Sequence, residues 1–118
     1  MKFDDIAQVS LLYDFYGQLL TKRQQEVLEL YHGENLSLSE IAEEFSISRQ
    51  GVHDTLKHGE KALQKYEETL GLVEKFARSR RAIEEIDGAI SQIAAESQDA
   101  GLIKQLRHIK TIIDELDQ

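Results

Sequence analysis

Residues 37–57 read SLSEIAEEFSISRQGVHDTLK and predict two short helices joined by a tight turn. Ser37 and Glu40 form a capping box, in which each side chain accepts a hydrogen bond from the backbone amide of the other residue. This box starts a helix that runs to about Phe45, and Ser48 caps the helix that follows. A turn of about three residues makes the two helices cross steeply, which is the layout of a DNA-binding helix-turn-helix.

The second helix of this motif has polar side chains that the expected small core does not use. Its N-terminal end is the one that meets base edges in the major groove, where arginine suits guanine and glutamine suits adenine. We predict base contacts from Arg49, Gln50 and His53, and phosphate contacts from Ser48, Lys57 and Lys61. Asp54 weakens this interpretation because it would face the negative backbone. The alternative is that the unit is a protein-docking platform.

The charge of the chain is unevenly distributed. Its 118 residues include 22 acidic and 14 basic residues, for a formal net charge of −8, whereas nucleic-acid binders usually carry a basic face. Residues 1–48 contain three basic and nine acidic residues, and residues 49–81 contain eight basic and five acidic ones. Positive charge therefore begins where the second helix of the motif begins. An ordinary solvated helix surface is the alternative explanation.

The remaining sequence predicts an all-α fold, because proline is absent and good helix formers are abundant. An amphipathic helix is expected over residues 3–16, ending at Gly17, and a second from the capping box of Thr21 and Gln24 to about Tyr31. A heptad-like seam then begins at Val52. The pattern does not decide whether the helix breaks at Gly71.

Two further helices with narrow aliphatic stripes flank a turn at residues 97–101. We place a helix-turn-helix domain at residues 1–70 and a helical hairpin at residues 71–118. Three- and four-residue spacing is typical of helices that pair in coiled coils, so we predict that the hairpin joins two or more copies of the chain. The alternative is a bundle within one chain. Its Arg78, Arg80 and Arg81 are candidate phosphate contacts for structured RNA, although we favour ion pairing with neighbouring glutamates.

Other functional classes lack support in the sequence. His53 and His58 are five residues apart, which does not place them on one helical face, and no metal-binding, nucleophile-elbow or phosphate-loop motif is present. We therefore expect no enzymatic activity, no cofactor and no metal. The absence of cysteine fits a reducing compartment. The chain has no apolar run of the length that a signal peptide or membrane span needs, so a cytoplasmic protein is expected.

Four blocks of the sequence, residues 15–24, 36–44, 48–52 and 66–76, occur in the order seen in the YlxM family, which this chain resembles over about residues 6–76 and more loosely beyond. The part of the chain that contains the helix-turn-helix is also similar to region 4 of sigma factors, which reads promoters. The resemblance implies a small bacterial protein whose gene neighbours those of the signal recognition particle GTPases. It implies a role in co-translational protein targeting and no catalytic residues.

Two hypotheses follow from these observations. In the first, the chain is a nucleic-acid-binding regulator of DNA or structured RNA, tied by resemblance to the signal recognition particle. In the second, it is an acidic adaptor that binds a targeting GTPase or a basic ribonucleoprotein, because acidic proteins are steered toward basic partners. Dependence on Arg49 and on the acidic residues 40, 43 and 44 separates the two.

Overall fold

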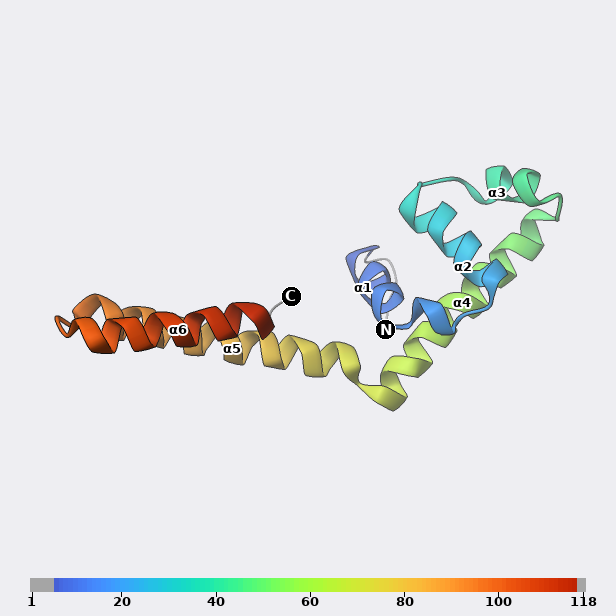
Figure 1. Cartoon of the computed structure of the whole chain (residues 1–118). Coiled ribbons are helices and arrows are strands. Elements are labelled where there is room, and N and C mark those ends of the chain that lie inside the picture. The colour runs from blue at the N-terminus through green and yellow to red at the C-terminus, as the bar shows by residue number, and fades with distance from the viewer. Residues whose placement is uncertain (1–5, 117–118) are drawn as a thin grey trace. The chain divides into compact units, whose positions relative to one another are not determined.

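The computed structural model describes residues 6–116, and every regular element in that range is helical (Figure 1). The elements are α1 (Ile6–Tyr16), η1 (Gly17–Leu19), α2 (Lys22–Leu28), η2 (Glu29–Gly33), α3 (Leu38–Phe45), α4 (Arg49–Leu70), α5 (Leu72–Glu96) and α6 (Ala100–Leu116). The predicted all-α fold class is confirmed. The chain divides into two compact units, Met1–Val73 and Glu74–Gln118, which we call the head and the arm.

The head is built around α4, against which α1, α2 and α3 all pack. One stripe of α4 contributes Val52, Leu56 and Leu63, which are buried because residues four and seven apart share a face of a helix. The three shorter helices cover that stripe with Val9, Leu12, Tyr16, Val27, Leu28, Ile41 and Ala42. The same helix therefore holds the core together and begins with the predicted base-reading residues.

The predicted starts of α2 and α3 are confirmed. The Oγ1 of Thr21 accepts a hydrogen bond from the Gln24 amide at 3.2 Å, and the Oγ of Ser37 accepts one from the Glu40 amide at 3.1 Å. Both capping boxes are closed by the reciprocal bond. Hydrogen bonding with Ser37, from its backbone amide above all, holds the pKa of the Glu40 carboxyl below its usual value. Short polar side chains thus fix where α2 and α3 begin.

The first helix ends at Tyr16 as predicted, but the conformation expected of Gly17 and the end expected of the second helix are wrong. Gly17 is not a left-handed C′ glycine. It opens the 3₁₀ turn η1, and a Cβ added there would lie 3.0 Å from the Tyr13 ring, so packing explains the glycine. The helix expected to reach Tyr31 ends as an α-helix at Leu28 and continues as the π-helical turn η2. The expected start of α1 at residue 3 lies outside the described residues.

The chain does break at Gly71, which separates α4 from α5 with a left-handed φ of 62°. The Tyr16 hydroxyl donates to Glu67 Oε1 at 2.5 Å and accepts from the Leu72 amide at 3.0 Å. Glu67 Oε1 also accepts from the Val73 amide at 3.0 Å. The first amides of α5 are thereby satisfied inside the head, where a helix start otherwise leaves them without partners.

The arm consists of α6 and all but the first residues of α5, which form an antiparallel hairpin (Figure 1). Its small core contains Ile90, Leu106 and Ile113, with Ile83 packed against them. Asp99 caps α6 by accepting hydrogen bonds from the amides of the first turn.

The crossing of α2 and α4 gives a stability prediction at Gly59. This glycine is buried, and a Cβ added to it would lie 3.1 Å from Leu28 Cδ1. Gly59→Leu should lower the free energy of unfolding by ~1–3 kcal/mol, because it overpacks the crossing. Urea denaturation followed by circular dichroism measures this. The control is Gly33→Leu in the same unit, where the added Cβ meets no atom within 4 Å; equal losses from both variants would contradict the prediction.

Candidate nucleic-acid interface

The α3–turn–α4 motif is closed by its own backbone and by two fully buried aliphatic residues. Ser46 occupies the left-handed conformation, with φ 56° and ψ 44°, where the sequence has no glycine. The Ile47 amide donates to the Ala42 carbonyl at 3.1 Å. Ile41 and Val52 are both 0% exposed, so α3 is fixed against the start of α4.

The first turn of α4 presents the predicted base-reading residues together. Ser48 caps the helix through its Oγ, which accepts from the Gly51 amide at 2.9 Å. Arg49, Gln50 and His53 line one surface hollow of ≈ 330 Å³, whose remaining wall is Leu38 of α3. Leu38 is the lining residue that sequence reasoning missed. Three side chains with hydrogen-bonding capacity therefore converge at the end of α4 that enters a major groove in helix-turn-helix proteins.

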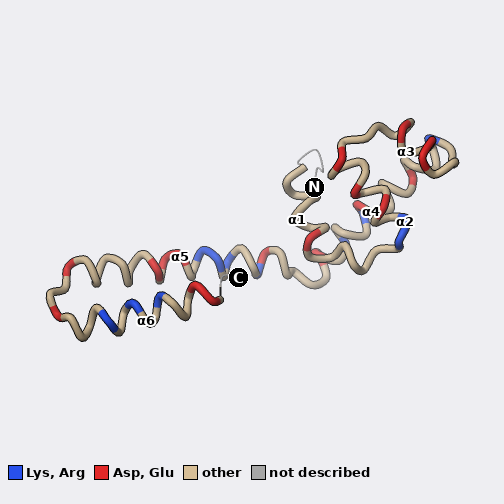
Figure 2. Tube along the Cα trace, turned by 45° about the horizontal axis from the view of Figure 1, so that its top comes forward, with Lys and Arg blue, Asp and Glu red and all other residues tan. Residues whose placement is uncertain are grey.

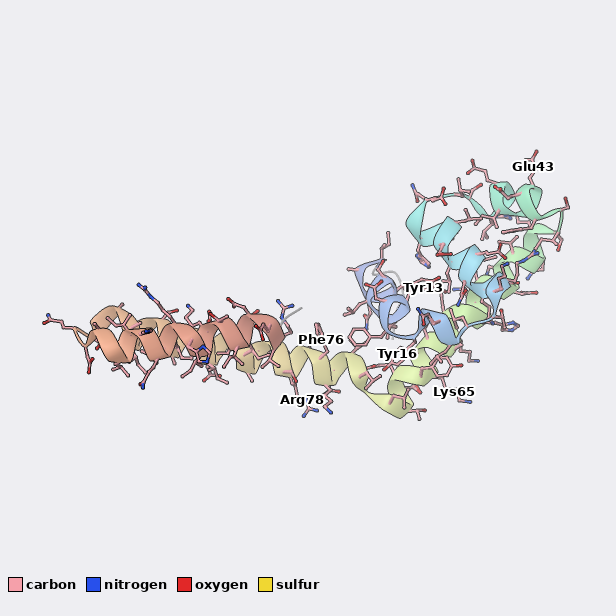
Figure 3. All side chains as sticks on the ribbon, in the orientation of Figure 1. Tyr13, Tyr16, Glu43, Lys65, Phe76 and Arg78 are labelled. Atoms are coloured by element: carbon pink, nitrogen blue, oxygen red, sulfur yellow. The ribbon has the colours of Figure 1, made fainter. Side chains whose placement is uncertain are left out.

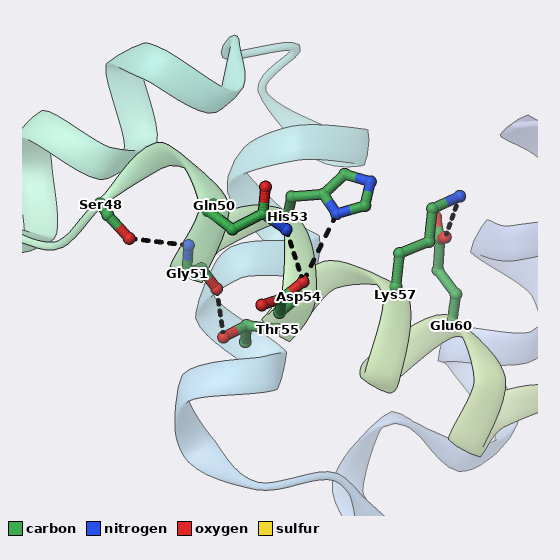
Figure 4. A network of polar contacts seen from close by, with 8 residues as sticks. All are labelled: Ser48, Gln50, Gly51, His53, Asp54, Thr55, Lys57 and Glu60. Carbon is green, nitrogen blue, oxygen red and sulfur yellow. Dashed lines mark hydrogen bonds and ion pairs between the residues drawn. The ribbon is translucent and has the colours of Figure 1, made fainter.

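Asp54 sits among these side chains and constrains two of them (Figure 4). Its Oδ1 accepts a hydrogen bond from Gln50 Nε2 at 2.9 Å and lies 3.6 Å from His53 Nδ1. The Nδ1 atom of His53 is buried and has no hydrogen-bond partner. Asp54 therefore pre-orients the Gln50 amide, and it also places a negative charge beside the predicted contacts.

The two predicted phosphate-contacting lysines lie further along α4. Lys57 is exposed, with its Nζ 4.0 Å from Glu60 Oε1, and Lys61 is exposed one turn later. Glu60 itself is buried and forms a 2.7 Å contact with His32 Nε2 from η2. Only the lysine of this pair is exposed, at 64%, and Glu60 keeps its contact with His32 when Lys57 turns toward a phosphate.

A second surface of the head is strongly acidic (Figure 2). One hollow of ≈ 340 Å³ is lined by Leu36 and by Glu40, Glu43 and Glu44 of α3; Glu43 projects outward (Figure 3). A neighbouring hollow of ≈ 350 Å³ is lined by Glu26, Glu29, Leu30, Glu34, Glu44 and Phe45. Glu44 is common to both, so the two hollows form one acidic surface, which also includes Leu30, Leu36 and Phe45.

The predicted phosphate contacts Arg78, Arg80 and Arg81 belong to the arm. Arg80 Nη2 lies 3.8 Å from Glu84 Oε1, and its guanidinium stacks over the Phe76 ring at 5.8 Å. Arg78 and Arg81 are exposed. The expected pairing with a glutamate is therefore present for Arg80.

Metal-binding groups and membrane-spanning helices are both absent from the described part of the chain. Residues 6–116 contain no group of three or more histidine, cysteine, aspartate or glutamate side chains able to hold a metal ion. None of the helices in that range is long and apolar enough to cross a membrane.

Comparison with known proteins gives one consistent result. A family model described as "Putative helix-turn-helix protein, YlxM / p13 like" matches residues 3–106. A UPF0122 protein of Desulforamulus reducens is 44% identical over 110 residues, which cover 93% of this chain and 94% of that protein. Its counterpart in Acetivibrio thermocellus is 45% identical over 113 residues, or 96% and 97% of the two chains. That of Geobacillus kaustophilus is 40% identical over 111 residues, or 93% and 94%.

The cap of α4 gives a second stability prediction. Ser48→Ala removes the acceptor of the Gly51 amide and should lower the free energy of unfolding by ~1 kcal/mol. Thermal unfolding by circular dichroism measures the change. Ser39→Ala, at an exposed position in the first turn of α3, is the matched control and should stay within ~0.5 kcal/mol of the parent. An unchanged Ser48→Ala protein would mean that the cap does not stabilise the interface.

Proposed function

This chain belongs to the YlxM / p13-like helix-turn-helix family, and on that premise we propose that its head is a nucleic-acid reader with a regulatory role. The observation that carries the proposal is the hollow at the start of α4, where Arg49, Gln50 and His53 converge. Arginine and glutamine at this end of a helix-turn-helix match guanine and adenine edges. The cap at Ser48 leaves the amides of the first turn close by for a phosphate.

The nucleic acid that we propose is either duplex DNA or the structured RNA of the signal recognition particle. The support for the particle is the resemblance to the YlxM family, and the support for duplex DNA is the likeness of the head to region 4 of sigma factors. The local positive charge of residues 49–81 favours both ligands over a neutral partner.

Substitutions of Arg49 and of Asp54 should change the affinity for nucleic acid in opposite directions. Arg49→Ala should weaken specific binding by ~1–3 kcal/mol. Asp54→Asn should strengthen binding and steepen its salt dependence, because it removes a negative charge beside the contacts. Fluorescence anisotropy of labelled genomic duplex fragments and of signal recognition particle RNA, at two salt concentrations, measures both effects.

Lys65→Ala is the charge-matched control for Arg49→Ala. Lys65 is exposed on the same helix, sixteen residues beyond Arg49 (Figure 3), and at ~1.5 Å per residue that is roughly 24 Å away. Its loss should leave specific affinity almost unchanged. If Arg49→Ala and Lys65→Ala weakened binding equally, only general electrostatics would be involved and the reader function would be rejected.

A second candidate function rests on the acidic surface of α2 and α3. We propose as the alternative that this surface docks a basic protein, a signal recognition particle GTPase or a ribonucleoprotein, and modulates it. Two neighbouring hollows are lined by glutamates and by apolar residues such as Leu36, which fits basic side chains with aliphatic stems. The guanidinium of Arg23 already lies 4.2 Å from the centroid of the Phe45 ring beside them. The net charge of −8 steers such a partner toward the chain.

Neutralising α3 tests the alternative. Replacing Glu40, Glu43 and Glu44 by glutamine should weaken binding of the particle's GTPase at least tenfold and leave Arg49-dependent nucleic-acid binding intact. Glutamine at position 40 keeps the capping box. A control that neutralises Glu68, Asp114 and Glu115, which are exposed elsewhere, removes the same formal charge. Isothermal titration calorimetry of full-length proteins measures the affinities, and identical losses in both triple variants would reject a specific docking surface.

We also propose that the arm joins copies of the chain, so that one oligomer carries more than one head. Support comes from the thin core of the hairpin, in which only three aliphatic side chains are buried within the described residues. Several other aliphatic residues of α5 and α6 remain exposed.

A further inference from the structure

One side of the arm is an exposed apolar face, which we call the open face. On α5 it consists of Ala82, Ile86, Ala89 and Ile93, spaced four, three and four residues apart. On α6 it consists of Leu102, Ile109, Ile112 and Leu116, with Gln105 in the same stripe. The six isoleucine and leucine residues are between 37% and 68% exposed. Each stripe has the heptad spacing of a coiled-coil seam.

The two stripes lie on the same side of the hairpin. At 100° per residue, Asp87 and Ser91 fall to one side of Ile90 on α5. Both contact Lys110 of α6, at 3.5 Å and 2.6 Å respectively, so this edge of the hairpin is polar on both helices. The stripes fall to the other side of Ile90 and of Leu106. The hairpin is therefore amphipathic as a whole, with one charged face and one apolar face.

The open face is larger than a monomer of this size is expected to leave in water. Monomeric proteins rarely expose contiguous apolar patches of more than a few hundred Å², and six half-exposed aliphatic side chains reach that size. The hairpin has no disulfide and no proline, and short units with so small a core usually gain stability from association. Such a face favours association with another apolar surface.

We propose that the cover is the open face of a second copy, stacked in antiparallel orientation about a two-fold axis that crosses α5 and α6 at right angles. This inference deepens the joining role proposed for the arm and is independent of nucleic-acid binding. It gives a four-helix bundle in which α5 packs on α5 of the other copy and α6 packs on α6.

The sequence of α5 is complementary to itself in this arrangement. With the axis between residues 87 and 88, Ala82 of one copy lies opposite Ile93 of the other, and Ile86 lies opposite Ala89. Each small side chain therefore faces a large one along the whole seam. Such alternation lets two helices approach closely without voids, as packing at interior density requires. A parallel stack would instead pack α5 against α6 and lose this match.

The stripe on α6 has the same centre. The hairpin turns at residues 97–99, so residue 109 lies at about the level of residues 87 and 88, in agreement with the Lys110–Asp87 ion pair. The axis therefore passes through Ile109, which meets its own counterpart, and it brings Leu102 opposite Leu116. One axis therefore serves both seams, as an isologous interface demands. It places Gln105 within about one residue of the level of Ile112 of the other copy.

Sedimentation equilibrium of the full chain without nucleic acid tests whether the open face forms a dimer. The parent should sediment as a dimer. Ile86→Asp should raise the dimer dissociation constant by roughly 100-fold, because the axis buries the new charge twice. Thr111→Asp, on the charged side of α6, should leave the constant unchanged, and circular dichroism checks that each variant is helical. A monomeric parent would overturn the proposal. So would a dimer whose dissociation constant rises as much with Thr111→Asp as with Ile86→Asp.

Single cysteines test the register, because the chain has none of its own. Ile109→Cys lies on the axis and should form a disulfide-linked dimer under mild oxidation. Ala82→Cys alone should not, whereas Ala82→Cys combined with Ile93→Cys should. Cross-linking at residue 82 alone, or none at residue 109 in a dimeric protein, would overturn the antiparallel arrangement. Neither experiment contains nucleic acid, so loss of the reader function cannot be mistaken for loss of the dimer.

Discussion

The head depends on one constraint: α4 is at once the central helix of the core and the helix that begins with the candidate nucleic-acid contacts. Its stripe of Val52, Leu56 and Leu63 is covered by α1, α2 and α3, so the direction of the first turn is set by packing several turns away. A change at the crossing, such as at Gly59, therefore reaches the interface through a rigid helix rather than through a loop. Conversely, a ligand bound at the first turn would stabilise the whole head, because it binds only the folded arrangement.

Charge decides how tightly such a reader could bind. The candidate contact residues at the start of α4 lie beside Asp54, and the neighbouring surface of α2 and α3 is acidic. A phosphate backbone approaching α4 meets the basic side chains of residues 49–61 only if it avoids α3. This arrangement favours a narrow footprint with few phosphate contacts, and hence modest salt dependence, because each neutralised phosphate adds to the salt slope. The same acidity favours a basic protein at the adjacent surface, so the two candidate functions use different faces of one head.

Local signals predicted the parts of the structure that local interactions create. The starts of α2, α3 and α4 follow from serine and threonine caps, and the position of Arg49 and Gln50 in the first turn of α4 follows from the cap at Ser48. Two of the features that were missed depend on residues distant in sequence. The π-helical turn η2 positions His32 against Glu60, 28 residues away. The hollow beside Arg49 needs Leu38 from the preceding helix. The contact of Gln50 with Asp54 was within reach, since residues four apart on a helix are neighbours.

The break at Gly71 shows why the end of α4 was undecidable from the sequence. Residues 49–96 have good helix formers on both sides of this glycine, so propensity alone would allow one continuous helix. Breaking it costs the backbone bonds of a helix end and a helix start. Tyr16 and Glu67 offset that cost, because they accept hydrogen bonds from the backbone amides of Leu72 and Val73 respectively. The Tyr16 ring is buried in the core, and this burial, with the bond to Glu67, raises the pKa of its hydroxyl, which stays protonated and able to donate. Tyr16 of α1 therefore stabilises the end of α4 at Leu70, and the break depends on the folded head as well as on the left-handed conformation of Gly71.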